Sequence, residues 1–161
     1  MLASFIESQI YTYFNFKPTF EQKKIIFSLS IYLTEPQSRG CFILNGYAGT
    51  GKTSIIGAVV ATLKELKINS VLLAPTGRAA KVMSVYSGSK GRTIHRHIYR
   101  KRSKGDLHSK FSLDINKDND TVYIIDEASM ISDSREGGTL VRVHFWPICL
   151  NISRLVTATK S

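Results

Sequence analysis

The sequence predicts an α/β domain in which a mostly parallel sheet is covered by helices on both faces. Three short apolar runs, at 41–45, 70–74 and 121–125, have the length and composition of buried strands. Between the first two runs, residues 52–66 place apolar side chains at helical spacing, so strand and helix alternate along the chain. Apolar strands that alternate with helices are typical of a parallel sheet that is buried on both faces.

The residues before the first strand predict two further elements. Residues 6–16 are rich in Tyr and Phe and fit either a short helix or an arm. Thr19 and Gln22 then have the spacing of a capping box, with Thr19 as the N-cap residue. Apolar residues follow at helical spacing up to Pro36, namely Ile25, Ile26, Leu29 and Leu33.

Beyond the second strand, residues 78–85 and 93–99 fit helices, and the polar stretch 103–119 fits a surface insertion. Cys41 opens the first strand and is interpreted as a small buried thiol. The first 16 residues lack a basic start before their apolar residues, and no uncharged apolar run approaches the roughly 20 residues that span a bilayer. We therefore expect a cytoplasmic protein without a membrane partner.

Length and charge limit the function classes. The 161 residues suffice for one domain and are too few for two full ones. The formal net charge is +10, and no acidic residue occurs between Glu65 and Asp106. That interval holds a basic block consisting of Lys67, Arg78, Lys81, Lys90, Arg92, Arg96, Arg100, Lys101, Arg102 and Lys104. Such a block suits a phosphate backbone or an anionic surface, although a solvated basic face also explains it.

A phosphate-binding loop is the strongest motif. Residues 46–53 match the pattern G-x-x-x-x-G-K-[S/T] in full, with an apolar run before them and a helical pattern after them. The glycines let the backbone turn tightly, so that its N–H groups form a concave nest for phosphate oxygens. Lys52 should reach the β and γ phosphates of ATP, and the Thr53 hydroxyl should coordinate Mg²⁺. The expected nucleotide-binding residues are Gln22, Gly46, Ala48, Gly49, Thr50, Gly51, Lys52 and Thr53.

An acidic pair follows the third strand. Asp126 and Glu127 come directly after an apolar run, and ligands of open α/β sheets bind at the carboxyl ends of strands. We expect Asp126 to hold the magnesium shell and Glu127 to orient or deprotonate the attacking water. The structural alternative is a helix N-cap followed by a carboxylate in the first turn. The catalytic residues are therefore predicted to be Lys52, Asp126 and Glu127, with Thr53 and Asp126 at the metal.

Four segments in this order resemble the superfamily 1 DNA helicases typified by the RecD subunit of exodeoxyribonuclease V. They are the Thr19–Gln22 capping box, the phosphate loop, the stretch 74–81 with 93–95, and the stretch 126–130. The resemblance covers residues 16–134 and implies a P-loop NTPase (RecA-like) fold, here the first motor domain. Residues 1–15 form an N-terminal arm or short helix in this division, and residues 135–161 form an atypical tail.

The resemblance also implies further roles. Gln22 resembles the glutamine that contacts the adenine ring, although its place in the capping box explains it equally well. The segments 75–81 and 93–95 resemble elements that contact single-stranded DNA, which assigns DNA contacts to Pro75, Thr76, Gly77, Arg78, Lys81, Thr93 and His95. An exposed helix start is the alternative for Arg78 and Lys81, and a structural role is the alternative for His95.

After Ser134 the resemblance ends. Helicases of this type continue with a strand that ends in a Gly-Asp and Gln-Leu-Pro-Pro sensor, and then with a second motor domain that supplies an arginine to the transferred phosphoryl group. Neither occurs in these residues. We expect the missing strand to leave a gap between the strands that end at Asn45 and Ile125, and the fold to be truncated.

Two hypotheses explain the tail. A DNA string that encodes residues 145–153 can be read in another frame as Leu-Ala-Asp-Leu-Leu-Glu-Tyr-Ile, an amphipathic helical pattern, which suggests translation out of frame. Alternatively, the tail is genuine and forms an edge strand, because Val141, Val143 and Phe145 alternate with Arg142 and His144.

The predicted function is an ATP-dependent 5′-to-3′ DNA helicase motor that is inactive as this chain alone. Alternatives are a module that binds nucleotide and nucleic acid without unwinding, another P-loop enzyme such as a small-molecule kinase, and a fragment that folds poorly. A kinase would leave residues 75–81 and 93–95 unexplained.

Overall fold

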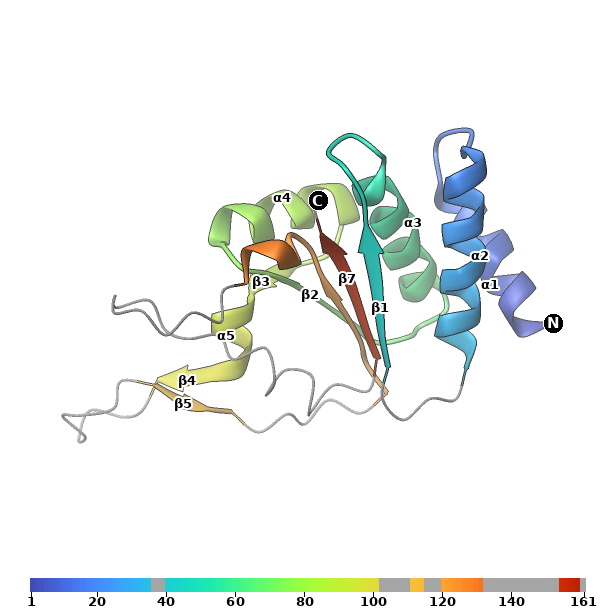
Figure 1. The fold of residues 1–161 in the computed structure, drawn as a ribbon. Coiled ribbons are helices and arrows are strands. Elements are labelled where there is room, and N and C mark those ends of the chain that lie inside the picture. Colours follow the sequence, from blue (N-terminus) through green and yellow to red (C-terminus); the bar gives the residue numbers. More distant parts are fainter. Residues whose placement is uncertain (36–39, 102–110, 115–119, 132–153, 160–161) are drawn as a thin grey trace.

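The computed structural model describes residues 1–35, 40–101, 111–114, 120–131 and 154–159 (Figure 1). Its helices are α1 (Leu2–Tyr13), α2 (Phe20–Thr34), α3 (Lys52–Glu65), α4 (Gly77–Ser87), α5 (Ile94–Ile98) and the 3₁₀ helix η1 (Ala128–Met130). Its strands are β1 (Gly40–Asn45), β2 (Ser70–Ala74), β3 (Gly91–Thr93), β4 (Tyr99–Lys101), β5 (Phe111–Leu113), β6 (Val122–Ile125) and β7 (Arg154–Thr159).

The main sheet has five strands in the order β1-β7-β6-β2-β3, and every pairing in it is parallel. All five strands therefore direct their carboxyl ends to the same edge of the sheet (Figure 1). A separate antiparallel pair, β4 with β5, follows α5. The structure confirms the α/β fold of a P-loop NTPase that the sequence predicts.

The centre of the sheet corrects one expectation. Strand β7 lies between β1 and β6, where a gap was expected, and it pairs in register with both neighbours. Leu44 of β1 pairs with Ala158, and Ile124 of β6 pairs with Val156. The side chains of Val156 and Ala158 are buried, so this strand contributes apolar surface to the core. The family's Gly-Asp sensor does not end this strand, so the motif that would identify it is absent from β7.

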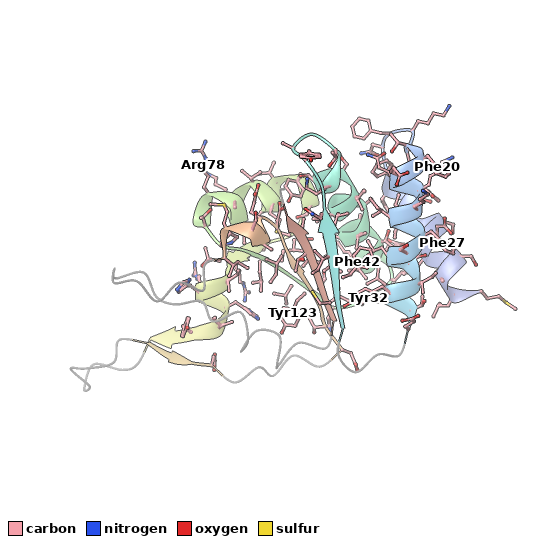
Figure 2. All side chains as sticks on the ribbon, in the orientation of Figure 1. Phe20, Phe27, Tyr32, Phe42, Arg78 and Tyr123 are labelled. Carbon is pink, nitrogen blue, oxygen red and sulfur yellow. The ribbon has the colours of Figure 1, made fainter. Side chains whose placement is uncertain are left out.

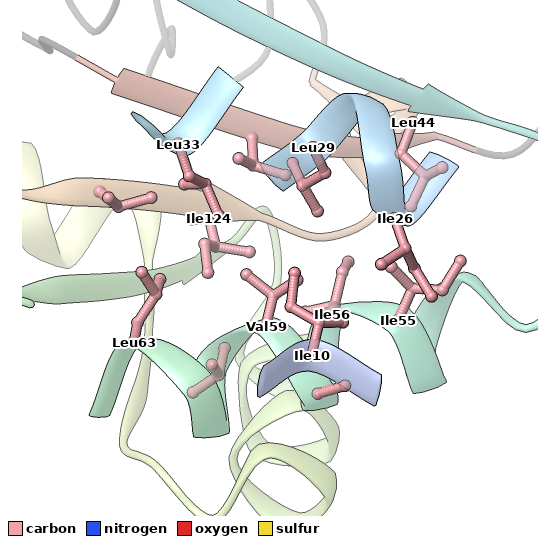
Figure 3. Close-up of a cluster of buried hydrophobic side chains, with 14 of the residues drawn as sticks. Ile10, Ile26, Leu29, Leu33, Leu44, Ile55, Ile56, Val59, Leu63 and Ile124 are labelled. Atoms are coloured by element: carbon pink, nitrogen blue, oxygen red, sulfur yellow. The ribbon is translucent and has the colours of Figure 1, made fainter. Parts of the chain in front are cut away.

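The larger core lies between the sheet and the helices α1, α2 and α3. Figure 3 shows its centre, where Ile10 of α1 and Ile26 of α2 converge on Ile56 of α3. Leu44 and Ile124 add side chains from the sheet. At roughly 25 cal/mol per Å² of buried apolar area, such side chains supply most of the driving force for this layer.

A second, smaller core covers the opposite face of the sheet. Leu73, Tyr123 and Ile125 point to this face from β2 and β6, and Ile94 of α5 packs against them. Residues Ile98, Ala128 and Ile131 lie at its border. Helices therefore cover both faces, as the sequence predicts, although the helices that cover the second face within the described residues are short.

Strand β1 is less buried than its composition suggests. Of its six residues only Leu44 is buried, and Cys41, Ile43 and Asn45 are exposed. The reason is the position of β1 at the edge of the sheet. On the face of β1 that points away from α1, α2 and α3, no element of the described residues covers the strand. The prediction that Cys41 is a buried thiol is therefore wrong.

The N-terminal elements agree with the sequence patterns. Residues 2–13 form helix α1, which packs on α2 and α3, so the arm alternative is wrong. The predicted capping box begins α2: Thr19 Oγ1 accepts from Gln22 N at 3.3 Å, and Gln22 Oε1 accepts from Thr19 N at 2.9 Å.

Several expectations fall partly or wholly outside the described residues. Of the predicted insertion at 103–119, only 111–114 is described, and its residues Phe111–Leu113 pair with β4. The alternating residues 141–145 and the frame-shifted stretch 145–153 lie outside the described ranges. Within those ranges, no helix combines the length and apolar character that crossing a bilayer requires.

Candidate nucleotide-binding site

The carboxyl edge of the sheet carries an open cleft of about 430 Å³. The loop after β1 forms one side of it, and the two residues after β6 form the other. Its lining consists of Ala48, Gly49, Gly51, Lys52, Thr53, Ser54, Asp126, Glu127 and Ala158. The structure thus brings Lys52 and Asp126 to the same cleft, and Ala158 of the interior strand β7 completes its lining.

The loop backbone turns through two left-handed glycines. Gly49 has φ +80°, and Gly51 has φ +85° and is the N-cap residue of α3. Residues with a Cβ rarely adopt this conformation, so the glycines are required by the turn itself. Successive N–H groups in such a turn form an anion-binding nest, and the positive end of the α3 dipole lies beside it.

The Lys52 side chain folds back into the loop. Its ammonium donates hydrogen bonds to the carbonyl oxygens of Gly46 and Tyr47, the latter at 2.7 Å. It also lies 3.4 Å from the Thr50 hydroxyl. The cation is therefore held within the concave side of the loop, where a phosphate oxygen would compete with neutral carbonyls for it.

Gln22 connects helix α2 to the loop. While its Oε1 completes the capping box, its Nε2 donates to the Thr50 carbonyl at 3.0 Å. The structure therefore shows the capping role and adds a loop contact that the sequence did not reveal. A contact with the adenine ring stays a prediction.

A larger residue at position 51 would displace the end of the Gln22 side chain and strain the backbone. A Cβ added to Gly51 would lie 2.5 Å from Gln22 Nε2, and its φ would be strained for any L-residue. We expect Gly51→Ala to abolish measurable binding of a fluorescent ATP analogue. The double variant Gly51→Ala/Gln22→Ala removes the clash and leaves the strained φ, so we expect partial recovery. Undiminished binding by Gly51→Ala would contradict this geometry.

Asp126 has a partner on each carboxylate oxygen. Its Oδ1 accepts from the backbone N–H of Glu127 at 2.9 Å, and its Oδ2 accepts from the hydroxyl of Tyr86 at 2.5 Å. Two hydrogen bonds from different directions fix the plane of this carboxylate. Each oxygen retains a lone pair, so both can still face a cation.

Tyr86 is the functional neighbour that the sequence analysis missed. It lies in the last turn of α4, 40 positions before Asp126, and is half-buried. Burial raises the pKa of Tyr86 well above its ordinary value, and the hydrogen bond and negative charge of Asp126 raise it further. The phenol thus stays protonated and acts as a hydrogen-bond donor. No local spacing rule predicts such a long-range pair.

Glu127 adopts a left-handed backbone conformation with φ +56°. It is the N-cap residue of η1, but its side chain makes no capping hydrogen bond. The structural alternative, an N-cap residue followed by a carboxylate in the first turn, is therefore not observed, because Glu127 itself is the N-cap residue and the first turn of η1 holds no acidic residue. The left-handed conformation costs a non-glycine residue about 1–3 kcal/mol, and residues strained in this way cluster at functional sites. The conformation of Glu127 is consistent with a placement dictated by the cleft.

The two segments expected to contact DNA lie side by side. Ala74 of β2 pairs in parallel with Thr93 of β3, so the residues that follow each strand emerge together at the carboxyl edge. Both threonines serve as helix N-caps: Thr76 Oγ1 accepts from Ala79 N, and Thr93 Oγ1 accepts from Arg96 N, each at 3.2 Å. These capping roles are compatible with a second hydrogen bond to a phosphate.

The basic residues on these elements face solvent. Arg78 projects outward from α4 (Figure 2). The other exposed members of the basic block are Lys67, Lys81, Lys90, Arg92 and Arg96. Within the described part of the chain, no salt bridge joins any of them to a carboxylate. His95 is half-buried, and its ring lies 5.5 Å from that of Tyr99, which favours a partly structural role.

The residues of the cleft fit a nucleoside triphosphate with Mg²⁺. The ion is usually held by one or two side-chain oxygens together with phosphate oxygens and water. Thr53 and Asp126 are side-chain oxygen donors that line the same cleft, and the nest and Lys52 supply positive potential for the phosphates. Nucleotide and ion would therefore bind together.

Comparison with known proteins agrees with this geometry. Residues 33–143 match a protein family described as an AAA domain. The match includes the phosphate loop and the acidic pair, and it extends beyond Ser134. The uncharacterized protein MJ1519 of Methanocaldococcus jannaschii is 36% identical over 109 residues, covering 61% of this chain. The chain spans 9% of the length of that protein.

Proposed function

This chain belongs to the AAA domain family of P-loop, helicase-like nucleotide-binding proteins, and from that membership and the cleft we propose that it is the ATP-binding motor domain of a 5′-to-3′ DNA helicase. In this proposal, ATP hydrolysis drives translocation along single-stranded DNA. The observation that carries it is the shared cleft, in which the loop cation Lys52 and the carboxylates Asp126 and Glu127 line one volume.

In this proposal, each part of the cleft has one role. The loop amides and Lys52 bind and orient the β and γ phosphates. Asp126 and Thr53 hold the magnesium ion, which supplies charge neutralisation for the transferred phosphoryl group when bound. Glu127 orients the attacking water and accepts its proton, for which a carboxylate beside the cleft is suited. Gln22 secures the loop from α2.

DNA is proposed to cross the carboxyl edge beside this cleft, over Thr76, Arg78 and Lys81 of one segment and Thr93 and His95 of the next. The support is the pairing of β2 with β3, which places both segments together, and the exposed basic residues around them. Contacts of this kind bind phosphates and carry little base specificity. The RecD-like character of the motor and its direction of movement belong to this proposal as well.

For the 161-residue chain itself we expect weak ATP binding, negligible turnover and no unwinding. A stabilising arginine from a second motor domain contributes roughly 10³–10⁵ in rate in related enzymes. The 161 residues assayed by themselves would not be supplied with that arginine. Robust unwinding by the purified chain would contradict this expectation.

Salt dependence tests the DNA surface. The affinity for a fluorescent poly-dT oligonucleotide should fall linearly on a log–log scale with salt, with a slope of about −0.7 per phosphate contacted. The double variant Arg78→Ala/Lys81→Ala should reduce the slope by about 1.4, measured by fluorescence anisotropy. Lys23→Ala/Lys64→Ala removes the same charge from exposed positions on α2 and α3 and should leave the slope unchanged. Equal slopes for the two double variants would contradict the proposed DNA-binding surface.

A further inference from the structure

The hydrogen bond between Tyr86 and Asp126 links helix α4 to the cleft. The hydroxyl of Tyr86 donates to Asp126 Oδ2 at 2.5 Å, and Asp126 Oδ1 is held by the N–H of the next residue. The hydrogen bond from the Glu127 N–H alone would restrain one oxygen of the Asp126 carboxylate. The contact from α4 restrains the second, so rotation of the carboxylate about χ2 would break a hydrogen bond.

The body of α4 holds the phenol in place. Met83, three residues earlier, is fully buried in the larger core, and Ala80 is buried on the same side of the helix. The carbonyl of Tyr86 approaches α3 so closely that a Cβ added at Gly57 would lie 3.5 Å from it. The Tyr86 side chain itself is packed against the larger core.

Tyr86 also lines a second hollow, of about 510 Å³. Residues at the ends of α1 and α4 and along α3 form this hollow. That hollow shares Thr53 and Ser54 with the nucleotide cleft. Tyr86 thus lines the same hollow as Thr53 and donates a hydrogen bond to Asp126, and these two residues are the expected side-chain donors to the metal.

We infer that Tyr86 is a positioning residue, whose hydroxyl orients the Asp126 carboxylate for Mg²⁺ and so sets the magnesium dependence of nucleotide binding. The inference rests on the proposed function, since it assumes that Asp126 serves the ion. A neutral donor leaves the full negative charge on the carboxylate while fixing its direction. Partners that orient a metal-binding side chain in this way typically change metal affinity by 10- to 100-fold when removed.

The test removes the hydroxyl and keeps the ring. The full chain and its Tyr86→Phe variant are titrated with Mg²⁺ at a fixed concentration of a fluorescent ATP analogue, with anisotropy as the readout. We expect the half-saturating Mg²⁺ concentration to rise at least about 10-fold in Tyr86→Phe. Affinity for the analogue in EDTA should be unchanged, because the loop and Lys52 are untouched.

A matched control is available on α1. The hydroxyl of Tyr11 donates to the Glu7 carboxylate at 3.3 Å, so Tyr11→Phe also removes a phenol–carboxylate hydrogen bond. We expect its Mg²⁺ titration to match that of the original chain. In the background of Asp126→Ala, Tyr86→Phe should have no further effect, because the carboxylate that it orients is gone.

The outcomes separate the inference from the proposed function. An unchanged Mg²⁺ titration in folded Tyr86→Phe overturns the positioning role. The same follows if Tyr86→Phe raises the half-saturating Mg²⁺ concentration equally in the original chain and in the Asp126→Ala variant. Nucleotide binding by the original chain that does not respond to Mg²⁺, or no binding at all, counts against the proposed function instead. Circular dichroism checks the fold of each variant. If Tyr86→Phe does not fold, Tyr86→Leu replaces it with the same expected rise.

Discussion

Replacing Lys52 with alanine is expected to lower the affinity for ATP by about 10- to 100-fold. Its ammonium lies inside the phosphate loop, where it already binds three oxygens of the loop. A hydrogen bond to a charged group contributes about 1.5–3 kcal/mol, and each 1.4 kcal/mol corresponds to tenfold in affinity. Isothermal calorimetry or anisotropy with a fluorescent analogue, in the presence of Mg²⁺, measures the loss.

The control is Lys64→Ala, which removes an equal charge from the last turn of the same helix, far from the cleft. Its affinity should match that of the original chain. Equal affinity of Lys52→Ala and Lys64→Ala would mean that the loop does not bind the triphosphate, and the motor interpretation would fail with it.

Replacing Val156 with aspartate is expected to prevent folding. Val156 is 1% exposed and lies in the interior strand β7, with β1 on one side and β6 on the other. A carboxylate there would be buried among apolar side chains without a partner, at a cost above about 4 kcal/mol, whereas small domains have only about 5–15 kcal/mol in total. Far-ultraviolet circular dichroism and urea unfolding report the loss.

Val85→Asp is the matched control, because Val85 is 79% exposed on the outer side of α4. It should change the free energy of unfolding by less than about 0.5 kcal/mol. If Val156→Asp were as stable as Val85→Asp, β7 would not occupy the interior of the sheet.

The hypothesis that 145–153 is read out of frame stays a prediction, and resequencing the gene in independent clones tests it.

The sequence predicts the local features of the site because each follows from short-range rules. The left-handed turns at Gly49 and Gly51 follow from the glycine spacing, and the capping box follows from the Thr19–Gln22 pair. The position of the acidic pair follows from the apolar strand that precedes it. The phosphate loop, α3 and the strand before the acidic pair were thus predicted close to their observed bounds, whereas β7, which adds Ala158 to the cleft, was not predicted.

Features that depend on distant partners were not predictable in this way. Strand β7 contains strand-forming residues such as Val156 and Thr157, but its place in the sheet depends on pairing with the distant strands β1 and β6. Likewise, nothing near Tyr86 indicates that its hydroxyl meets Asp126. The exposure of Ile43 and Cys41 depends on which face of β1 the helices cover, which is set by the whole topology.

The place of β7 also governs the order in which this protein can assemble during synthesis. Strand β1 begins at Gly40, yet its neighbour in the sheet begins only at Arg154. While the ribosome is still making the intervening chain, β1 on one side and β6, β2 and β3 on the other are separate halves with open edges. Exposed edges of this kind recruit other strands, so a holdase chaperone would be most useful in that interval.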